Sequence, residues 1–199
     1  MDIIRFFDIL FASLGLIILS PFFIIIALCI KFTSAGSVFF KQTRVGKNNI
    51  DFKLFKFRSM MQNAELKGQL TIGGKDNRIT TVGYYLRKFK LDELPQFLNV
   101  LFGDMSFVGP RPEVRKYVDL YNEHQKKILL VLPGITDYAS VAFRNENELL
   151  AKAANPELFY IEEVMPKKIE LNFKFIKSRN IKTYFFILFS TVITTFRGK

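Results

Sequence analysis

The hydrophobic pattern of the chain begins with a long uncharged run. No charged residue lies between Ile9 and Ile30, and as a straight helix this stretch would be about 33 Å long, enough to cross a bilayer core of about 30 Å. Ser20 and Pro21 interrupt the run near its centre. Because proline removes a backbone hydrogen bond and bends a helix, two geometries fit: a kinked span, or a helix that enters and leaves on one side. The pattern alone favours the kinked span, since membrane helices tolerate proline.

The remaining pattern predicts an α+β fold that is mostly helical, with one domain over 32–199 behind a membrane helix over 1–31. Stretches 37–40 and 52–57 are rich in Phe and Val and predict a short β-hairpin with a turn at 46–49. Periodic apolar positions and turn residues predict the other segments. These are helices over 59–67, 94–101, 113–131 and 146–180, a loop over 68–83 and a turn-rich connector over 103–112.

A second apolar stretch closes the chain. It covers 184–196 within a predicted helix over 183–197, and it is too short for a comfortable span. We therefore expect an interfacial or docked helix, with Lys182 and Arg197 reaching toward lipid headgroups.

Basic residues follow the first apolar run closely. The 199 residues carry a formal net charge of +11, from 29 Lys and Arg against 18 Asp and Glu. The positive-inside rule then keeps everything after the run in the cytoplasm. A surplus of this size predicts an anionic partner: a phospholipid surface, a nucleic acid or a phosphorylated substrate. With one cysteine (Cys29) and one histidine (His124), the chain has no internal disulfide framework and no site with several Cys or His ligands.

The acidic pair Asp92–Glu93 is the most informative short stretch. Asp92 fits a helix N-cap, Glu93 the first helical position and Pro95 the first turn. In the simplest interpretation, Asp92 caps the helix and Glu93 complements its dipole. A helix start also attracts anions, and the density of basic residues around the pair favours a binding role. Those residues are Arg78, Arg87, Lys88, Lys90 and Arg111.

Two further stretches present basic side chains. Arg111 lies between Pro110 and Pro112, and a restricted backbone leaves its guanidinium little entropy to lose when it grips a phosphate bidentately. An ordinary rigid turn with a solvated arginine is the alternative. Stretches 41–46 and 56–58 alternate basic and other residues, which would share one face of a strand. That face suits a phosphorylated ligand, or it is a solvated surface near lipid headgroups.

Taken in order, these stretches resemble one known family. The motifs lie at 40–46, 55–60, 76–80, 83–88, 91–96, 99–101 and 103–112. Together with the Ser-Pro break they resemble the bacterial sugar transferases, also called monotopic phosphoglycosyl transferases. The resemblance implies transfer of a sugar 1-phosphate from a nucleoside diphosphate sugar, usually a UDP-sugar, to polyprenyl (undecaprenyl) phosphate with release of UMP. This is the first membrane step of bacterial glycan assembly, at the cytoplasmic face of the inner membrane.

The resemblance also implies roles for particular residues. Asp92 would be the nucleophile that forms a phosphosugar intermediate and would lie near a Mg²⁺ ion, with Glu93 as its acid–base partner. Ser20 and Pro21 would make the N-terminal helix re-entrant, in place of the span that the pattern alone favours. The implied phosphate- and substrate-binding residues are Lys56, Arg58, Arg78, Arg87, Arg111 and Arg144.

One segment departs from the family pattern. After the Pro-Gly-Ile-Thr run at 133–136, many members continue Gly-Trp-Ala-Gln-Val-Asn-Gly-Arg, whereas this chain differs over 137–143 and keeps only Arg144. The donor sugar therefore stays open, as do the acceptor's chain length and the oligomeric state. The competing hypothesis is a membrane-anchored basic adaptor that binds anionic lipid or nucleic acid without catalysis. It leaves the acidic pair unexplained, and we expect no nucleic-acid partner.

Overall fold

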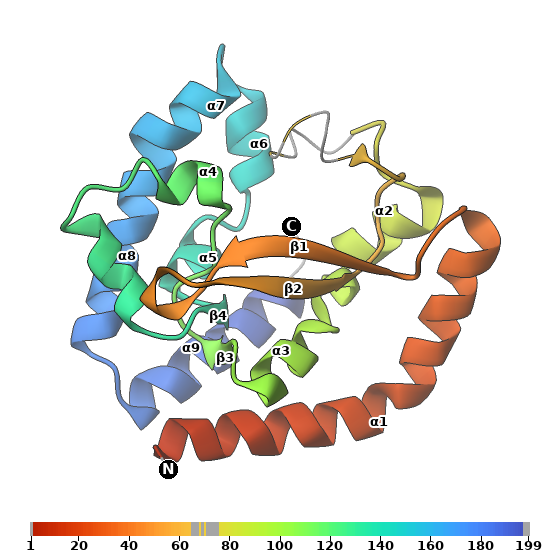
Figure 1. Cartoon of the computed structure of the whole chain (residues 1–199), viewed down its shortest axis with the longest axis horizontal. Coiled ribbons are helices and arrows are strands. Elements are labelled where there is room, and N and C mark those ends of the chain that lie inside the picture. The colour runs from red at the N-terminus through yellow and green to blue at the C-terminus, as the bar shows by residue number, and fades with distance from the viewer. Residues whose placement is uncertain (1, 65–67, 69, 71–75, 197–199) are drawn as a thin grey trace.

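The computed structural model describes residues 2–64, 68, 70 and 76–196. Helices dominate it, and one β-hairpin lies across the middle of the view in Figure 1. The first half contains α1 (Ile3–Thr33), β1 (Phe39–Val45), β2 (Asp51–Phe57), α2 (Thr81–Lys88), α3 (Gln96–Phe102) and β3 (Ser106–Val108). The second half contains α4 (Arg115–Val118), β4 (Gly134–Thr136), α5 (Tyr138–Ala142), α6 (Glu146–Ala151), α7 (Pro156–Phe159), α8 (Met165–Lys177) and α9 (Ile181–Phe196).

Helix α1 changes direction between its two halves, so that it runs along one edge of the molecule and then along the next (Figure 1). Pro21 lies inside the helix and has no N–H to donate to the carbonyl of Ile17. The hydroxyl of Ser20 donates to that carbonyl at 2.8 Å. The Ser-Pro pair therefore breaks the backbone ladder and also satisfies the acceptor that the break would leave unpaired.

Both halves of α1 pack against the same body. In the first half, Arg5 donates to the carbonyls of Val100 (2.6 Å) and Leu101 (3.1 Å) at the end of α3. The buried carboxylate of Asp8 accepts from the Ser106 hydroxyl and the Phe107 N–H. At the other end, Ile30 is buried with Phe57 and Leu86. The apolar side chains near the bend face outward; they include Ile17, Ile18, Phe22, Ile24 and Ile25.

The hairpin is antiparallel, with Phe39 opposite Phe57 and Val45 opposite Asp51. It confirms the predicted hairpin, and its turn contains Asn48 and Asn49 at positive φ, which asparagine tolerates. Asn99 joins α3 to β2, because its side chain accepts from the Phe55 N–H (2.9 Å) and donates to the Lys53 carbonyl (2.8 Å). The hairpin's basic side chains are thereby brought beside the segment that precedes α3.

A short parallel pair, β3 and β4, supports the Pro-Arg-Pro turn. The backbones approach closely here: a Cβ on Gly134 would overlap the backbone of Gly109, and a Cβ on Gly109 would overlap the carbonyl of Leu132. The Gly134 N–H donates to the Pro110 carbonyl at 2.9 Å. Arg111 is therefore held directly beside β4 and the start of α5.

Helix α9 packs one face inward through Tyr184 and Ile187, and it exposes an apolar face that includes Phe186, Phe189, Val192 and Ile193. Among the described residues, α1 alone is long and apolar enough to cross a membrane, while α9 is a shorter apolar helix. The predicted helix near the C-terminus is confirmed, and so is the mostly helical fold with a short hairpin.

Four predicted segments differ from the structure. The stretch 113–131 forms only α4 and the short 3₁₀ helix Gln125–Leu130, because Asn122 and Gln125 bond each other's backbone N–H groups and turn the chain between them. In the expected helix over 59–67, Met60 instead forms a β-bridge with Ile79, and 65–67 lie outside the described residues. The connector over 103–112 contains β3, and the end of the predicted loop belongs to α2, which Thr80 caps.

Candidate active site

The acidic pair lies in a 3₁₀ turn, Leu91–Glu93, between α2 and α3. Lys90 precedes it in the left-handed conformation (φ 58°) and reverses the chain. The predicted N-cap role of Asp92 is wrong. The Leu94 N–H already bonds the Leu91 carbonyl, and Pro95 has no N–H to offer a capping carboxylate. Asp92 is instead buried, with 6% of its surface exposed.

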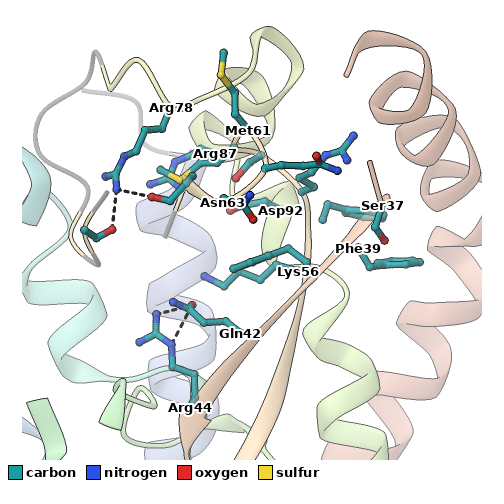
Figure 2. Close-up of a pocket in the computed structure, with 18 residues that line it drawn as sticks. Ser37, Phe39, Gln42, Arg44, Lys56, Met61, Asn63, Arg78, Arg87 and Asp92 are labelled. Atoms are coloured by element: carbon teal, nitrogen blue, oxygen red, sulfur yellow. Dashed lines mark hydrogen bonds between the residues drawn. The ribbon is translucent and has the colours of Figure 1, made fainter. Parts of the chain in front are cut away.

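Asp92 lies in the wall between two cavities. One, the hairpin cavity, has a volume of about 490 Å³ and is formed mainly by β1, β2 and residues 58–64 (Figure 2). The other, the α5–α9 cavity, has a volume of about 430 Å³ and is formed by the acidic turn, α5 and α9. Both cavities are lined by Lys56, Arg87 and Asp92. The buried Asp92 thus borders both cavities, together with two cationic residues.

Glu93 faces the α5–α9 cavity and is ion-paired. Both terminal nitrogens of the Arg111 guanidinium donate to its carboxylate, Nη1 at 3.3 Å from Oε2, and Lys56 Nζ lies 3.4 Å from Oε1. Burial by itself would raise the pKa of Glu93, but the charges of Arg111 and Lys56 outweigh it and hold the pKa well below its usual range. Glu93 therefore carries its charge at neutral pH.

In the two neighbouring groups, Asp92 and Lys56, burial disfavours the charged form. Burial, together with the adjacent charge of Glu93, raises the pKa of Asp92, and Lys56 and Arg87 oppose that shift only in part. Burial also lowers the pKa of Lys56 to about 8, although Glu93 favours the ammonium. The site thus contains a carboxylate and an amine that are both poorly solvated, and an incoming phosphate would compensate the ammonium.

Four of the six predicted phosphate- and substrate-binding residues line the α5–α9 cavity, which Asp92 also lines. Lys56 and Arg87 line both cavities, while Arg111 and Arg144 line the α5–α9 cavity. Lys88 and Lys90 line that cavity too.

The other two predicted arginines are engaged by backbone carbonyls, although both line the hairpin cavity. Arg58 donates to the Ser34 carbonyl (2.7 Å) and so holds the end of α1. Arg78 is paired with Asp76 and donates to the carbonyls of Ala64, Gly68 and Leu70. Both arginines thus shape the wall of the cavity, and the buried Nε and Nη1 of Arg58 have no hydrogen-bond partner among the described residues, so its role in binding phosphate stays a prediction.

The sequence reasoning missed Asp137 and Ser140. One oxygen of the buried Asp137 carboxylate accepts the Arg111 N–H (3.3 Å), and the other accepts the Ser140 N–H (2.6 Å) at the start of α5. Asp137 therefore fixes Arg111 relative to α5. Aspartate is a preferred N-cap residue, so Asp137 would have located the start of α5.

A cluster behind Arg111 was also missed. Glu113 accepts a hydrogen bond from the Tyr160 hydroxyl and lies 3.7 Å from both Arg44 Nη1 and Lys168 Nζ. Arg44 also donates to the Pro112 carbonyl at 3.0 Å. These contacts stiffen the turn that carries Arg111, and no local pattern links Lys168 on α8 to the hairpin.

The acidic groups at the site suit one mode of metal binding. Within the described residues, no three His, Cys, Asp or Glu side chains gather in a metal-binding group. Mg²⁺ in phosphoryl-transfer sites is commonly held by one or two carboxylates together with substrate phosphates. Asp92, facing both cavities, fits that mode, whereas Glu93 is already engaged by Arg111.

A family model for bacterial sugar transferases matches residues 2–198. The chain belongs to the bacterial sugar transferase family. It is 40% identical over 197 residues to a UDP-N-acetylgalactosamine-undecaprenyl-phosphate N-acetylgalactosaminephosphotransferase of Aeromonas hydrophila, covering 98% of this chain and 44% of that protein.

Other family members differ in the sugar named. A UDP-glucose:undecaprenyl-phosphate glucose-1-phosphate transferase of Escherichia coli K12 is 38% identical over 198 residues, covering 96% of this chain and 40% of that protein. An exopolysaccharide production protein of Sinorhizobium fredii is 38% identical over 165 residues, with 75% and 73% covered. The chain thus spans about two fifths of the length of the first two relatives and most of the third.

Proposed function

We propose that this chain transfers a sugar 1-phosphate from a UDP-sugar to a polyprenyl phosphate and releases UMP. The observation that carries the proposal is the position of Asp92, a buried carboxylate that faces two cavities and is flanked by Lys56 and Arg87. Two relatives are named for this type of reaction, with undecaprenyl phosphate as acceptor.

The chemistry proceeds in two displacements at one phosphorus. A carboxylate oxygen of Asp92 attacks the phosphorus that bears the sugar; the bond to the bridging oxygen breaks, and UMP leaves with the electron pair. A phosphate oxygen of the acceptor then attacks the same phosphorus, and the bond to Asp92 breaks to restore the carboxylate. The products are UMP and a polyprenyl diphosphate sugar. Covalent catalysis of this kind divides one transfer into two easier steps.

The basic side chains make that attack feasible. A diphosphate repels a carboxylate, and positive charge placed around it stabilises the charge that spreads over the oxygens during transfer. Arg111 presents a planar fork suited to phosphate, and Lys56 and Arg87 line both cavities together with the nucleophile. The raised pKa of Asp92 reflects a poorly solvated carboxylate, and poor solvation favours nucleophilic attack.

Glu93 acts in this proposal chiefly by orienting cations. Its low pKa keeps it ionised, whereas a proton carrier works best with a pKa near the operating pH. The ion pairs with Arg111 and Lys56 hold both cations next to Asp92 before substrate arrives. The acid–base role implied by the resemblance requires those pairs to open when the phosphates bind.

Mg²⁺ is the proposed cofactor. It would neutralise the donor diphosphate, and Asp92 would hold it together with the phosphate oxygens. The protein offers too few carboxylates in the described part of the site to hold the ion by itself. We therefore expect metal binding to depend on the donor.

The membrane arrangement is part of the proposal. The two ends of α1 pack on one body, and exposed apolar side chains occur along the helix from Ile3 to Phe32, those at the bend included. A helix whose ends both attach to the same domain enters and leaves a bilayer on one side. Together with the exposed apolar face of α9, this supports our proposal of a site at the cytoplasmic surface of the membrane, where a lipid phosphate and a soluble nucleotide would both have access.

A donor panel tests the function. The purified full chain is incubated in detergent with Mg²⁺, undecaprenyl phosphate and, one at a time, UDP-glucose, UDP-galactose and their N-acetylated forms, and UMP is assayed. We expect UMP and a lipid diphosphate sugar with at least one donor, and neither product with Asp92→Asn of equal thermal stability. Lipid or nucleic-acid binding without UMP release would favour the basic adaptor instead.

A further inference from the structure

The two cavities that meet at Asp92 have different linings. The hairpin cavity includes Phe39, Phe40, Met60 and Met61 and reaches the end of α1 through Ser37. The α5–α9 cavity includes neutral polar side chains beyond its cations, among them Ser140, Asn147 and Thr194. The first lining suits a flat base or a lipid chain near its phosphate, and the second suits hydroxyl and amide groups.

The geometry of phosphoryl transfer, taken with the proposed function, limits how substrates use these cavities. Attacking and leaving oxygens lie roughly in line across the phosphorus. Asp92 therefore attacks from the side opposite UMP, and the acceptor must attack from the side opposite Asp92. The acceptor phosphate thus enters where the phosphate of UMP has just left. The sugar stays attached to the phosphorus, through its oxygen, in both steps. Neither step therefore requires the sugar to move.

We propose that the α5–α9 cavity holds the sugar during both half-reactions, that the hairpin cavity receives first the nucleotide and then the lipid phosphate, and that Ser140 determines which sugar is accepted. This inference rests on the proposed function. It gives the two cavities different roles. The α5–α9 cavity keeps the sugar bound throughout, and the hairpin cavity binds the nucleotide in the first step and the lipid phosphate in the second.

The contacts of Ser140 support this assignment. Its hydroxyl oxygen is buried and has no hydrogen-bond partner in the part of the chain that the structure describes. A buried hydroxyl without a partner is unfavourable by about 1–3 kcal/mol, and a sugar hydroxyl or acetamido group would supply one. Asp137 holds the backbone of Ser140 and that of Arg111 through its two oxygens. The hydroxyl therefore lies in a fixed relation to the arginine that faces the phosphates.

The divergent segment lies on the same cavity. Ala139, Ser140, Val141 and Phe143, all within 137–143, line the α5–α9 cavity, and none of them lines the hairpin cavity. Relatives that share undecaprenyl phosphate in their names differ in the sugar, N-acetylgalactosamine in one and glucose in another. A segment that departs from the family pattern is best placed against the part of the substrate that varies.

A pair of matched variants tests the proposal. Ser140→Ala and Ser37→Ala each remove one hydroxyl, from the α5–α9 cavity and the hairpin cavity respectively. For each variant, UMP release without acceptor is measured as a single turnover on each of the four UDP-sugars. The quantity compared is the second-order rate constant for the first half-reaction. Ser140→Ala should change the ratio between preferred and other donors by about tenfold, and Ser37→Ala should leave that ratio unchanged.

The outcomes distinguish the assignment of the two cavities from the proposed transferase function. Asn147→Ala, a second variant in the same cavity, should also shift the donor ratio, and UMP should inhibit competitively against undecaprenyl phosphate. A uniform loss on all donors with Ser140→Ala, an unchanged ratio, or noncompetitive inhibition by UMP would overturn the assignment of the two cavities while leaving the transferase intact. A wild-type chain that releases no UMP from any donor would overturn the proposed function itself, and this inference with it.

Discussion

Arg111 grips Glu93, the direct neighbour of Asp92, through both terminal nitrogens of its guanidinium. The two residues come from separate segments, one from the turn before α3 and one from the Pro-Arg-Pro turn beside β4. Their pairing is the contact that assembles the site from these segments. It also places a fork-shaped cation where the nucleophile's substrate would lie.

Arg111→Lys tests this pairing. Lysine keeps the charge but not the fork, so Glu93 loses its two parallel hydrogen bonds and the phosphates lose a bidentate partner. We expect kcat/KM for UMP release to fall by about 10- to 100-fold, the range for a lost hydrogen bond to a charged group. Lys116→Arg, at an exposed ion pair with Glu157, is the control and should leave turnover unchanged.

The lowered pKa of Lys56 predicts that kcat/KM for the donor falls at basic pH. Burial lowers its pKa to about 8 in the free protein, so the ammonium that faces the phosphates is lost as pH rises through 8. We expect kcat/KM for the donor to fall above that pH, and Lys56→Arg, which stays charged, to move the fall to higher pH. An identical fall in Lys56→Arg would exclude Lys56 as its source.

The same pKa shift has a consequence for stability. The folded chain binds fewer protons than the unfolded chain between about pH 8 and the ordinary lysine pKa of 10.5. The contribution of Lys56 to stability therefore becomes more favourable as pH rises through that window. Replacing Lys56 with Met should flatten this part of the stability curve.

The Ser-Pro bend in α1 predicts that both ends of the helix lie on the same side of the membrane. With Cys29 replaced by Ser, single cysteines at positions 3 and 33 should both be labelled from the cytoplasmic side. Replacing Ser20 and Pro21 together with Leu restores the backbone ladder and should move position 3 to the opposite face. Labelling of the unaltered bend from opposite faces would establish a span and contradict the re-entrant arrangement.

The contacts of Asn99 predict that its replacement destabilises the fold where β2 meets α3, next to the site. It is buried and satisfies the Phe55 N–H and the Lys53 carbonyl on β2. Asn99→Ala should lower the free energy of unfolding by about 2–5 kcal/mol, because two buried backbone groups lose their partner. Thermal unfolding in detergent measures this. Asn145→Ala is the control, since Asn145 makes no side-chain capping bond.

The sequence predicted those parts of the fold whose signals are local. The apolar run, the hairpin and the apolar C-terminal helix follow from composition and period, and the family motifs singled out Asp92 and Glu93. The cap assigned to Asp92 failed because Pro95 and Leu94 leave it no N–H to accept. A capping pattern and a buried nucleophile look alike in a sequence.

The features that the sequence did not predict depend on contacts between residues far apart in the chain. Arg58 and Arg78 carry the same charge as Arg87, yet carbonyls at the end of α1 and around residue 68 engage them. The link from Asp137 to both Arg111 and Ser140 requires β3 and β4 to be paired, and that pairing depends on the close approach of Gly109 to Gly134. Only the folded chain shows which partners each of these arginines has.

The nucleophilic role of Asp92 is tested most directly by the intact mass of the protein. The full chain is mixed with Mg²⁺ and its preferred UDP-sugar without acceptor, quenched in acid and analysed whole and after proteolysis. We predict one UMP released per chain, a mass increase of one phosphosugar located on the peptide that contains Asp92, and loss of the adduct when undecaprenyl phosphate is added. UMP release without an adduct, or an adduct that persists in Asp92→Asn, would contradict the account.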